Sequence, residues 1–159
     1  MNTKLKMTLI TTIFALAACA FLTPASANAQ GKNSLVGAWD MVITFRDCTT
    51  GNAIRERPGL ISFMFGGVMQ EFGTGQQLPQ NRTDAQGSWT HVNGRHYYSV
   101  SKAFRFNADG SLAGTAKLFR NIQLIDGDTF SADVASEIYD ADGVLIAQGC
   151  ATEAGTRLE

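Results

Sequence analysis

The sequence lacks an excess of either charge. Its 13 lysine and arginine residues face 14 aspartate and glutamate residues, so the formal net charge at pH 7 is −1. The basic residues form no continuous stripe and are not interleaved with aromatic residues, so nucleic acid is not an expected partner. No internal repeat, low-complexity segment or linker occurs between Leu35 and Glu159. This uniformity predicts one domain with one core.

Long hydrophobic runs are also scarce. The main one, Met7–Leu22, is interrupted by Thr11 and Thr12 and is shorter than the roughly 20 residues that a membrane-spanning helix needs. Lys4 and Lys6 precede it, and the small-x-small motif at 27–29 follows it. This order predicts a bacterial secretory signal peptide over residues 1–29, with a single mature domain over residues 30–159. The mature chain would keep 11 basic and 14 acidic residues, a net charge of −3.

A second interpretation of the leader remains open. Leu16-Ala17-Ala18-Cys19 resembles the lipobox of bacterial lipoproteins, in which the cysteine carries a lipid. Phe21 and Leu22 follow that cysteine, whereas a lipoprotein tether is usually polar, so simple secretion is favoured. In both cases we expect export to the periplasm or beyond. A lipid anchor at Cys19 would be the only contact with a membrane.

Cysteine is rare, with three residues in the whole chain. Removal of the leader leaves Cys48 and Cys150, and two thiols in an oxidising compartment favour a disulfide. Such a bond would close a loop of about 100 residues, which stabilises a fold by about 4 kcal/mol in the chain-entropy model. The alternative is a pair of buried, unpaired thiols.

The pattern of apolar residues has a period of two, which predicts strands and no helix. Glycine-containing turns such as Asn93-Gly94 and Asn107–Gly110 separate the strands and favour antiparallel hairpins. A long irregular loop is expected over Gly73–Gly87. The expected strands are Val36–Arg46, Leu60–Phe65, Val68–Phe72, Ser88–His91, His96–Phe106, Ser111–Ile125, Thr129–Tyr139 and Val144–Thr152. Eight strands with one apolar face each predict an all-β, up-and-down antiparallel barrel.

Turn geometry predicts which side chains face inward. A three-residue loop at 107–110 would set Phe106 opposite Leu112 and Tyr98 opposite Arg120, so even-numbered residues between 96 and 124 would share the inner face. The same reasoning sets His91 opposite His96, Trp89 opposite Tyr98, Phe65 opposite Val68, Val134 opposite Cys150 and Ser136 opposite Gln148.

The inner face predicted in this way contains polar as well as apolar side chains. No acidic residue falls on it, so we expect Arg120 to meet an anionic group of a ligand, or else to reach water at the mouth of the barrel. The expected ligand-binding residues are Trp39, Phe63, Trp89, His91, His96, Tyr98, Lys102, Phe104 and Arg120.

Catalytic and metal-binding patterns are weak. His91 and His96 are too few to form a metal site, so neither a metal nor a cofactor is expected. His96 and Tyr98 could act as an acid–base pair if the protein were an enzyme, because histidine titrates near neutral pH. No Gly-x-Ser-x-Gly motif marks a nucleophile.

Gly37-Ala38-Trp39 at the start of the first strand, followed by a meander of hairpins, resembles the lipocalins and the wider calycin group. The resemblance implies an eight-stranded barrel in which Trp39 closes one end and Arg157 packs on it. The mature chain also resembles small secreted bacterial barrels with a Cys-Thr-Thr-Gly turn after the first strand and Gly-Cys-Ala-Thr near the end.

Three functions are compatible with these observations. The first is binding of a small, largely apolar ligand, whose anionic group would meet Arg120. The second is a barrel enzyme that resembles allene oxide cyclases. The third is a filled barrel that binds other proteins through its outer surface or through the loop Gly73–Gly87. A large interior cavity would favour the first two over the third. The sequence indicates no oligomeric state.

Overall fold

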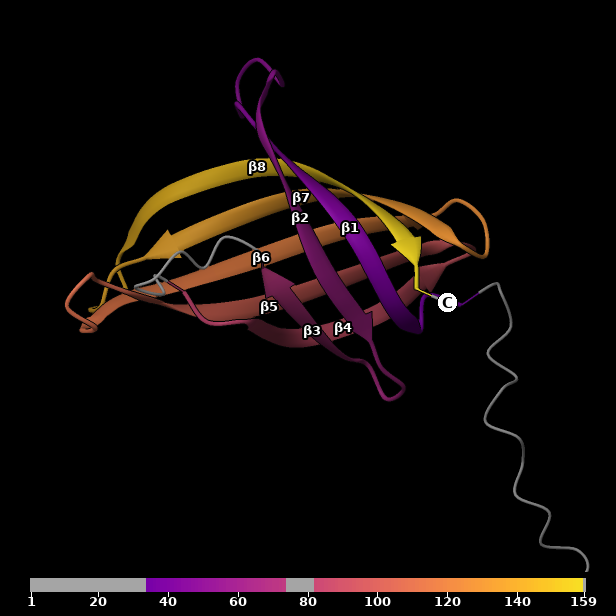
Figure 1. Cartoon of the computed structure of the whole chain (residues 1–159), viewed down its shortest axis with the longest axis horizontal. Coiled ribbons are helices and arrows are strands. Elements are labelled where there is room, and N and C mark those ends of the chain that lie inside the picture. Colours follow the sequence, from indigo (N-terminus) through magenta and orange to yellow (C-terminus); the bar gives the residue numbers. More distant parts are fainter. Residues whose placement is uncertain (1–33, 74–81, 159) are drawn as a thin grey trace, which may run out of the picture. The chain divides into compact units, whose positions relative to one another are not determined.

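The computed structural model describes residues 34–73 and 82–158. Strands, in which apolar and polar residues alternate, make up most of this part of the chain. Consecutive strands pair antiparallel, and the last strand pairs with the first, which closes an eight-stranded barrel. This confirms the predicted fold class. The strands are β1 (Gly37–Arg46), β2 (Ala53–Phe63), β3 (Val68–Gly73), β4 (Ala85–Asn93), β5 (His96–Phe106), β6 (Leu112–Leu124), β7 (Thr129–Tyr139) and β8 (Leu145–Arg157) (Figure 1).

Several expectations fall on residues that the structure does not describe. The signal peptide, its cleavage after Ala29 and the alternative anchor at Cys19 lie outside the described residues, as do residues 74–81 of the expected loop Gly73–Gly87. Within residues 34–73 and 82–158, no helix is long and apolar enough to cross a membrane.

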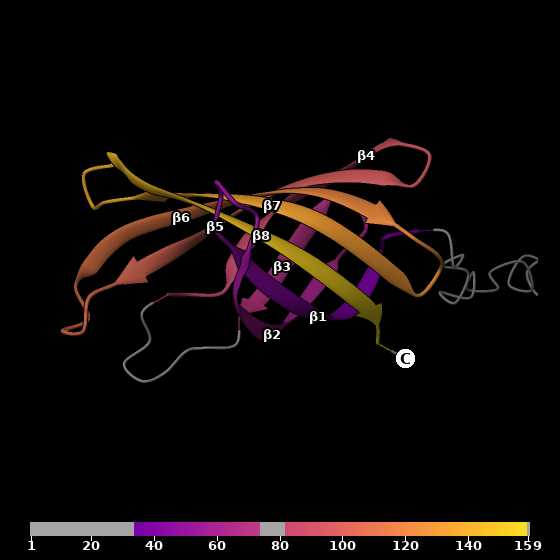
Figure 2. The same cartoon turned by 90° about the horizontal axis from the view of Figure 1, so that it is seen from above.

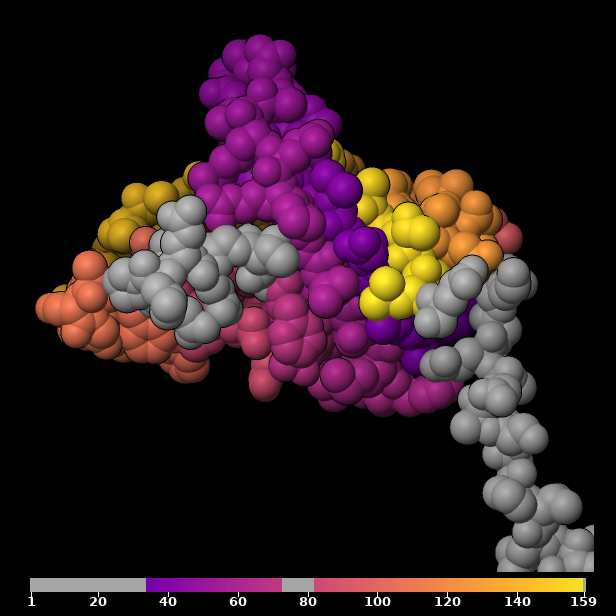
Figure 3. All heavy atoms as spheres, in the orientation of Figure 1, coloured from indigo at the N-terminus to yellow at the C-terminus, as the bar shows by residue number. Residues whose placement is uncertain are grey.

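The strands differ greatly in length. Strands β5 to β8 form a long curved wall, whereas β3 has six residues (Figures 1 and 2). Strand β2 begins at Ala53 rather than Leu60, and β8 ends at Arg157 rather than Thr152. Arginines, glutamates and a proline interrupt the apolar alternation of these added stretches, so the sequence pattern does not reveal them. The turn between β1 and β2 stands clear of the barrel surface (Figure 3).

The faces predicted for β5 are wrong because of one bulge. Phe106 lies opposite Leu112 as expected, but the register then shifts, so that Arg105 lies opposite Gly114 and Ser99 opposite Arg120. A one-residue shift moves every side chain of a strand to the other face. A side chain at Gly114 would collide with the Tyr139 carbonyl, and the φ of +129° at this position also favours glycine.

Three further hairpins are shifted from the predicted register by one residue. Phe63 lies opposite Met69, and Trp89 lies opposite Ser99. Val134 and Ser136 lie opposite Ala151 and Gly149, rather than Cys150 and Gln148. His91 lies opposite Tyr97, not His96. The Met64 N–H donates to the Val68 carbonyl, so the β2–β3 loop has three residues, one more than a two-residue turn, and the other two hairpins carry bulges.

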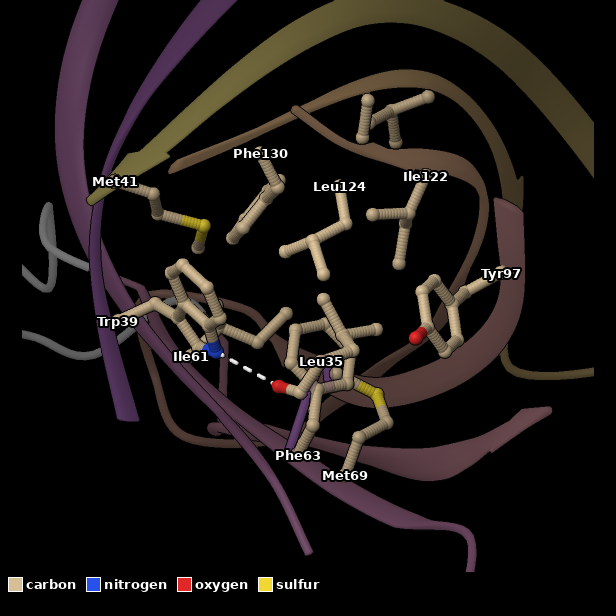
Figure 4. Packing of buried hydrophobic residues seen from close by; sticks show 12 residues of the cluster. Leu35, Trp39, Met41, Ile61, Phe63, Met69, Tyr97, Ile122, Leu124 and Phe130 are labelled. Atoms are coloured by element: carbon tan, nitrogen blue, oxygen red, sulfur yellow. Dashed lines mark hydrogen bonds between the residues drawn. The ribbon is translucent and has the colours of Figure 1, made fainter. Parts of the chain in front are cut away.

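One end of the barrel is filled by an apolar core. The Trp39 indole donates a hydrogen bond to the Leu35 carbonyl at 2.9 Å and meets Phe130 edge-on at 5.1 Å (Figure 4). The guanidinium of Arg157 lies 4.1 Å from the centre of the Trp39 ring and donates to the carbonyls of Ser34 and Val36. This is the contact that the lipocalin resemblance implied. The buried core residues are Leu35, Trp39, Met41, Ile61, Phe63, Met69, Tyr97, Ile122, Leu124, Phe130, Ala132 and Val134.

The predicted disulfide is present. Cys48 lies in the loop after β1, and Cys150 lies on β8, with their Cα atoms 5.2 Å apart. The tilt of the strands sets Arg46 of β1 opposite Cys150, which brings Cys48 within bonding range. Asp47 accepts hydrogen bonds from the backbone of Thr49 and Thr50, which fixes the loop that carries Cys48.

Candidate functional site

The interior of the barrel has three layers along the strands. On β6, Leu124 and Ile122 belong to the closed apolar end, Arg120 follows, and Leu118 and Ala116 line the open end. Ser101 of β5, Glu71 of β3 and Glu153 of β8 lie at the level of Arg120, whereas the inward residues of β1 are apolar along its whole length. This order arises because alternate residues of tilted strands stack in layers inside a barrel.

The middle layer is a chain of ion pairs. Arg120 is fully buried, and its Nε lies 2.9 Å from Oε2 of Glu153. Its Nη2 pairs with Glu71, and its Nη1 donates to Ser101 Oγ at 2.9 Å. The other oxygen of Glu71 accepts from Arg82 at 2.9 Å. Two arginines and two glutamates therefore form a neutral group across the barrel.

The two carboxyl groups of this layer titrate differently. Burial favours the neutral form of both, but at Glu71 the charges of Arg120 and Arg82 outweigh it and lower the pKa. At Glu153, burial dominates and raises the pKa, since Arg120 offsets only part of it and the charge of Glu71 adds to it. Burial also disfavours the charge of Arg120, yet both carboxylates together raise its pKa.

We expect opposite pH dependences when these carboxyl groups are replaced by amides. The stability that ionised Glu71 supplies is complete above the unfolded pKa near 4.5 and is lost as the pH falls through the lower folded value. Glu71→Gln should therefore destabilise the barrel most at neutral pH. The raised pKa of Glu153 contributes stability that is complete below pH 4.5, the unfolded pKa, and is lost as the pH rises through the higher folded pKa. Glu153→Gln should thus gain stability relative to the wild type as the pH rises.

Urea unfolding of both variants between about pH 3 and about pH 8 measures the slope with pH of the difference in unfolding free energy between each variant and the wild type. The wild-type protein is the reference at each pH. Slopes of the same sign for Glu71→Gln and Glu153→Gln would show that the two carboxyl groups are equivalent, which contradicts the asymmetry of the layer.

A pocket of about 560 Å³ occupies the open end of the barrel. Its apolar wall includes Ile43, Phe45, Leu118 and Val134, and the carboxyl groups of the ion-pair layer also line it. A smaller pocket of about 230 Å³ shares Phe45 and Leu118 with the larger one and therefore adjoins it. Binding sites for small molecules commonly enclose 300–1,000 Å³ with mainly apolar walls.

None of the nine predicted ligand-binding residues lines the larger pocket. Trp39 and Phe63 are fully buried in the closed end, and Trp89 packs against the same core. Trp89 also donates to the Met64 carbonyl at 3.0 Å. The exposed ring of His91 lies 5.0 Å from that of Tyr97 at the end of β4.

The other predicted residues on β5 lie on the outer face. Phe104 is 49% exposed, with Lys102 above its ring. His96 is exposed, and Tyr98 borders an outer groove, so neither reaches the interior. These two residues thus form no acid–base pair within the pocket. Arg120 does point inward, but it is held by glutamates rather than free for a ligand.

Four polar residues of the interior, Glu71, Glu153, Ser99 and Ser101, are not indicated by the sequence pattern. Glu71 was assigned to the outer face because of the shifted β2–β3 register, and Glu153 lies one residue beyond the predicted end of the last strand. Ser99 and Ser101 also read as outward-facing. Both are buried at inward positions of β5, and Ser101 accepts a hydrogen bond from Arg120, whereas the buried Ser99 hydroxyl has no hydrogen-bond partner among the described residues. A glycine within a strand, as at Gly114, was the available sign of a bulge.

Comparison with known proteins adds no family to this description. No protein-family model matches the chain, and no curated protein matches it at a significant level.

Proposed function

We propose that this protein binds a small, largely apolar ligand in the open half of the barrel. The pocket of about 560 Å³ carries the proposal, because a filled barrel would leave no such space. Its walls contain Ile43, Phe45, Leu118 and Val134, so transfer of an apolar body from water into it is favourable. The ion-pair layer closes the pocket toward the core and fixes its depth.

The lipocalin-like character of the barrel belongs to the same proposal. The stacking of Arg157 on Trp39 at one end, with an open pocket at the other, supports it. Export to the periplasm or beyond is proposed as well, and the Cys48–Cys150 disulfide is compatible with it. Fractionation of the source cells, followed by mass determination of the mature chain, tests cleavage after Ala29 against lipidation at Cys19.

A substitution that fills the pocket should abolish binding. Ser136 lines both pockets and is half-buried, so Ser136→Trp places an indole in the space that a ligand would occupy. We expect its affinity for the neutral fluorescent probe N-phenyl-1-naphthylamine to fall at least about tenfold relative to the wild type. A fluorescence titration measures the change.

Ser131→Trp is the matched control. Ser131 is exposed on the outer face of the same strand, so this variant should bind the probe as the wild type does. Equal affinities for the two variants, or no binding by the wild type, would refute the proposal. Native mass spectrometry of the protein purified from its own cells would identify any ligand that it retains.

A further inference from the structure

The arginines at the open end are not all neutralised. We propose that the pocket binds an amphiphile with an anionic head group, which Arg105 holds beside Arg82 while the apolar body extends along the pocket wall. This inference rests on the proposed function and adds the chemistry and the position of the head group.

Two arginines lie opposite each other on neighbouring backbone segments at this site. Arg82 and Arg105 pair across an isolated antiparallel bridge, and both line the smaller pocket. Like charges directly opposite each other on neighbouring strands are destabilising. Arg82 shares the carboxylate of Glu71, but the half-buried side chain of Arg105 makes no ion pair or hydrogen bond within residues 34–73 and 82–158. An anion between the two guanidinium groups would remove this repulsion.

The remaining charges that line the two pockets are mainly positive, with Arg46, Arg55 and Arg105 against Asp47. Both glutamates of the ion-pair layer are already held by Arg120 and Arg82, so they do not neutralise a further arginine. Arg55 lines the larger pocket with its guanidinium 4.5 Å from the centre of the Phe45 ring. Once Glu71 and Glu153 are paired with Arg82 and Arg120, the arginines that line the two pockets outnumber the remaining carboxylate, which favours an anionic ligand over a cationic one.

The surroundings of Arg105 fit an amphiphile rather than a polyanion. Ala116, Leu118 and Ile138 line the smaller pocket beside it, and Leu118 continues into the larger one. A guanidinium forms paired hydrogen bonds with a planar carboxylate and also binds sulfate or phosphate oxygens. An amphiphile whose head group binds Arg105 would therefore place its apolar tail against these side chains.

Calorimetric titration with three probes of equal chain length tests this inference. Decanoate and decyl sulfate carry an anionic head group, whereas 1-decanol does not. Arg105→Met removes the charge but keeps much of the length of the side chain. We expect this variant to bind decanoate roughly 10- to 100-fold more weakly than the wild type, with its affinity for 1-decanol unchanged. Comparison of decanoate with decyl sulfate shows which head group the site prefers.

Lys102→Met is the matched control, because Lys102 is exposed on the outer face of the same strand and its removal changes the net charge equally. It should bind decanoate as the wild type does. Equal wild-type affinities for decanoate and 1-decanol would overturn the head-group site while leaving the apolar pocket intact. An equal loss in Lys102→Met and Arg105→Met would also overturn it. Failure of all three probes to bind would instead overturn the proposed function itself.

Discussion

Replacement of Arg120 by leucine should lower the free energy of unfolding by about 3–5 kcal/mol, the largest effect of any single substitution proposed for this protein. The substitution leaves the buried carboxyl groups of Glu71 and Glu153 without their shared cation. Ser101 Oγ also loses the hydrogen bond that Arg120 donates to it. Urea unfolding measures the change as a shift of the midpoint at an unchanged slope.

A triple variant separates the cost of the unpaired charges from the loss of packing. Arg120→Leu combined with Glu71→Leu and Glu153→Leu removes all three charges, and buried ion networks replaced by apolar residues are often as stable as the original. We expect the triple variant to be more stable than Arg120→Leu alone. Arg82 is 28% exposed and can be solvated when Glu71 is absent. If the unfolding free energy of Arg120→Leu alone lay within about 1 kcal/mol of the wild-type value, the network would contribute little to stability.

Loss of the disulfide should have a comparable effect. Replacing Cys48 and Cys150 by serine should lower the free energy of unfolding by about 4 kcal/mol, because the bond joins residues 102 apart and restricts the unfolded chain. The native ladder between β1 and β8 pairs eight residues of each strand and should persist without the bond. Chemical denaturation under oxidising conditions measures the difference.

Reduction of the wild-type protein provides the control for this variant. A reductant should bring the wild-type unfolding midpoint to that of the double serine variant and leave the variant unchanged. If the reductant destabilises both proteins equally, the effect does not arise from the Cys48–Cys150 bond.

The sequence predicted the elements of this barrel better than their faces. The glycine-containing turns located eight strands, and the two cysteines of the mature chain indicated the disulfide. The inward orientation of Trp39 on β1 was also predicted correctly. The faces of β5 were not, because the bulge at Gly114 shifts the register after the first pair of residues. A hairpin fixes its register through the length of its loop and its bulges, and these are not determined by the alternation of apolar residues.

The site was harder to predict for a related reason. Ser99 and Ser101 read as outward-facing because they are polar, yet they are buried beside Arg120. Sequence patterns assume that the inside of a barrel is apolar, whereas this interior carries four charged side chains in its middle layer. A buried charge is stable when its partners are close, but the partners of Arg120 come from β3 and β8, far away in sequence.

The ion-pair layer gives the two halves of the barrel separate evolutionary freedom. Phe45 and Ser136 line the open pocket and lie outside the core cluster around Trp39, and substitutions at distant sites without common partners have additive effects. Changes at Phe45 or Ser136 can alter which molecule fits without weakening the packing around Trp39. New ligand preferences could therefore arise in this scaffold by mutation of the open end alone.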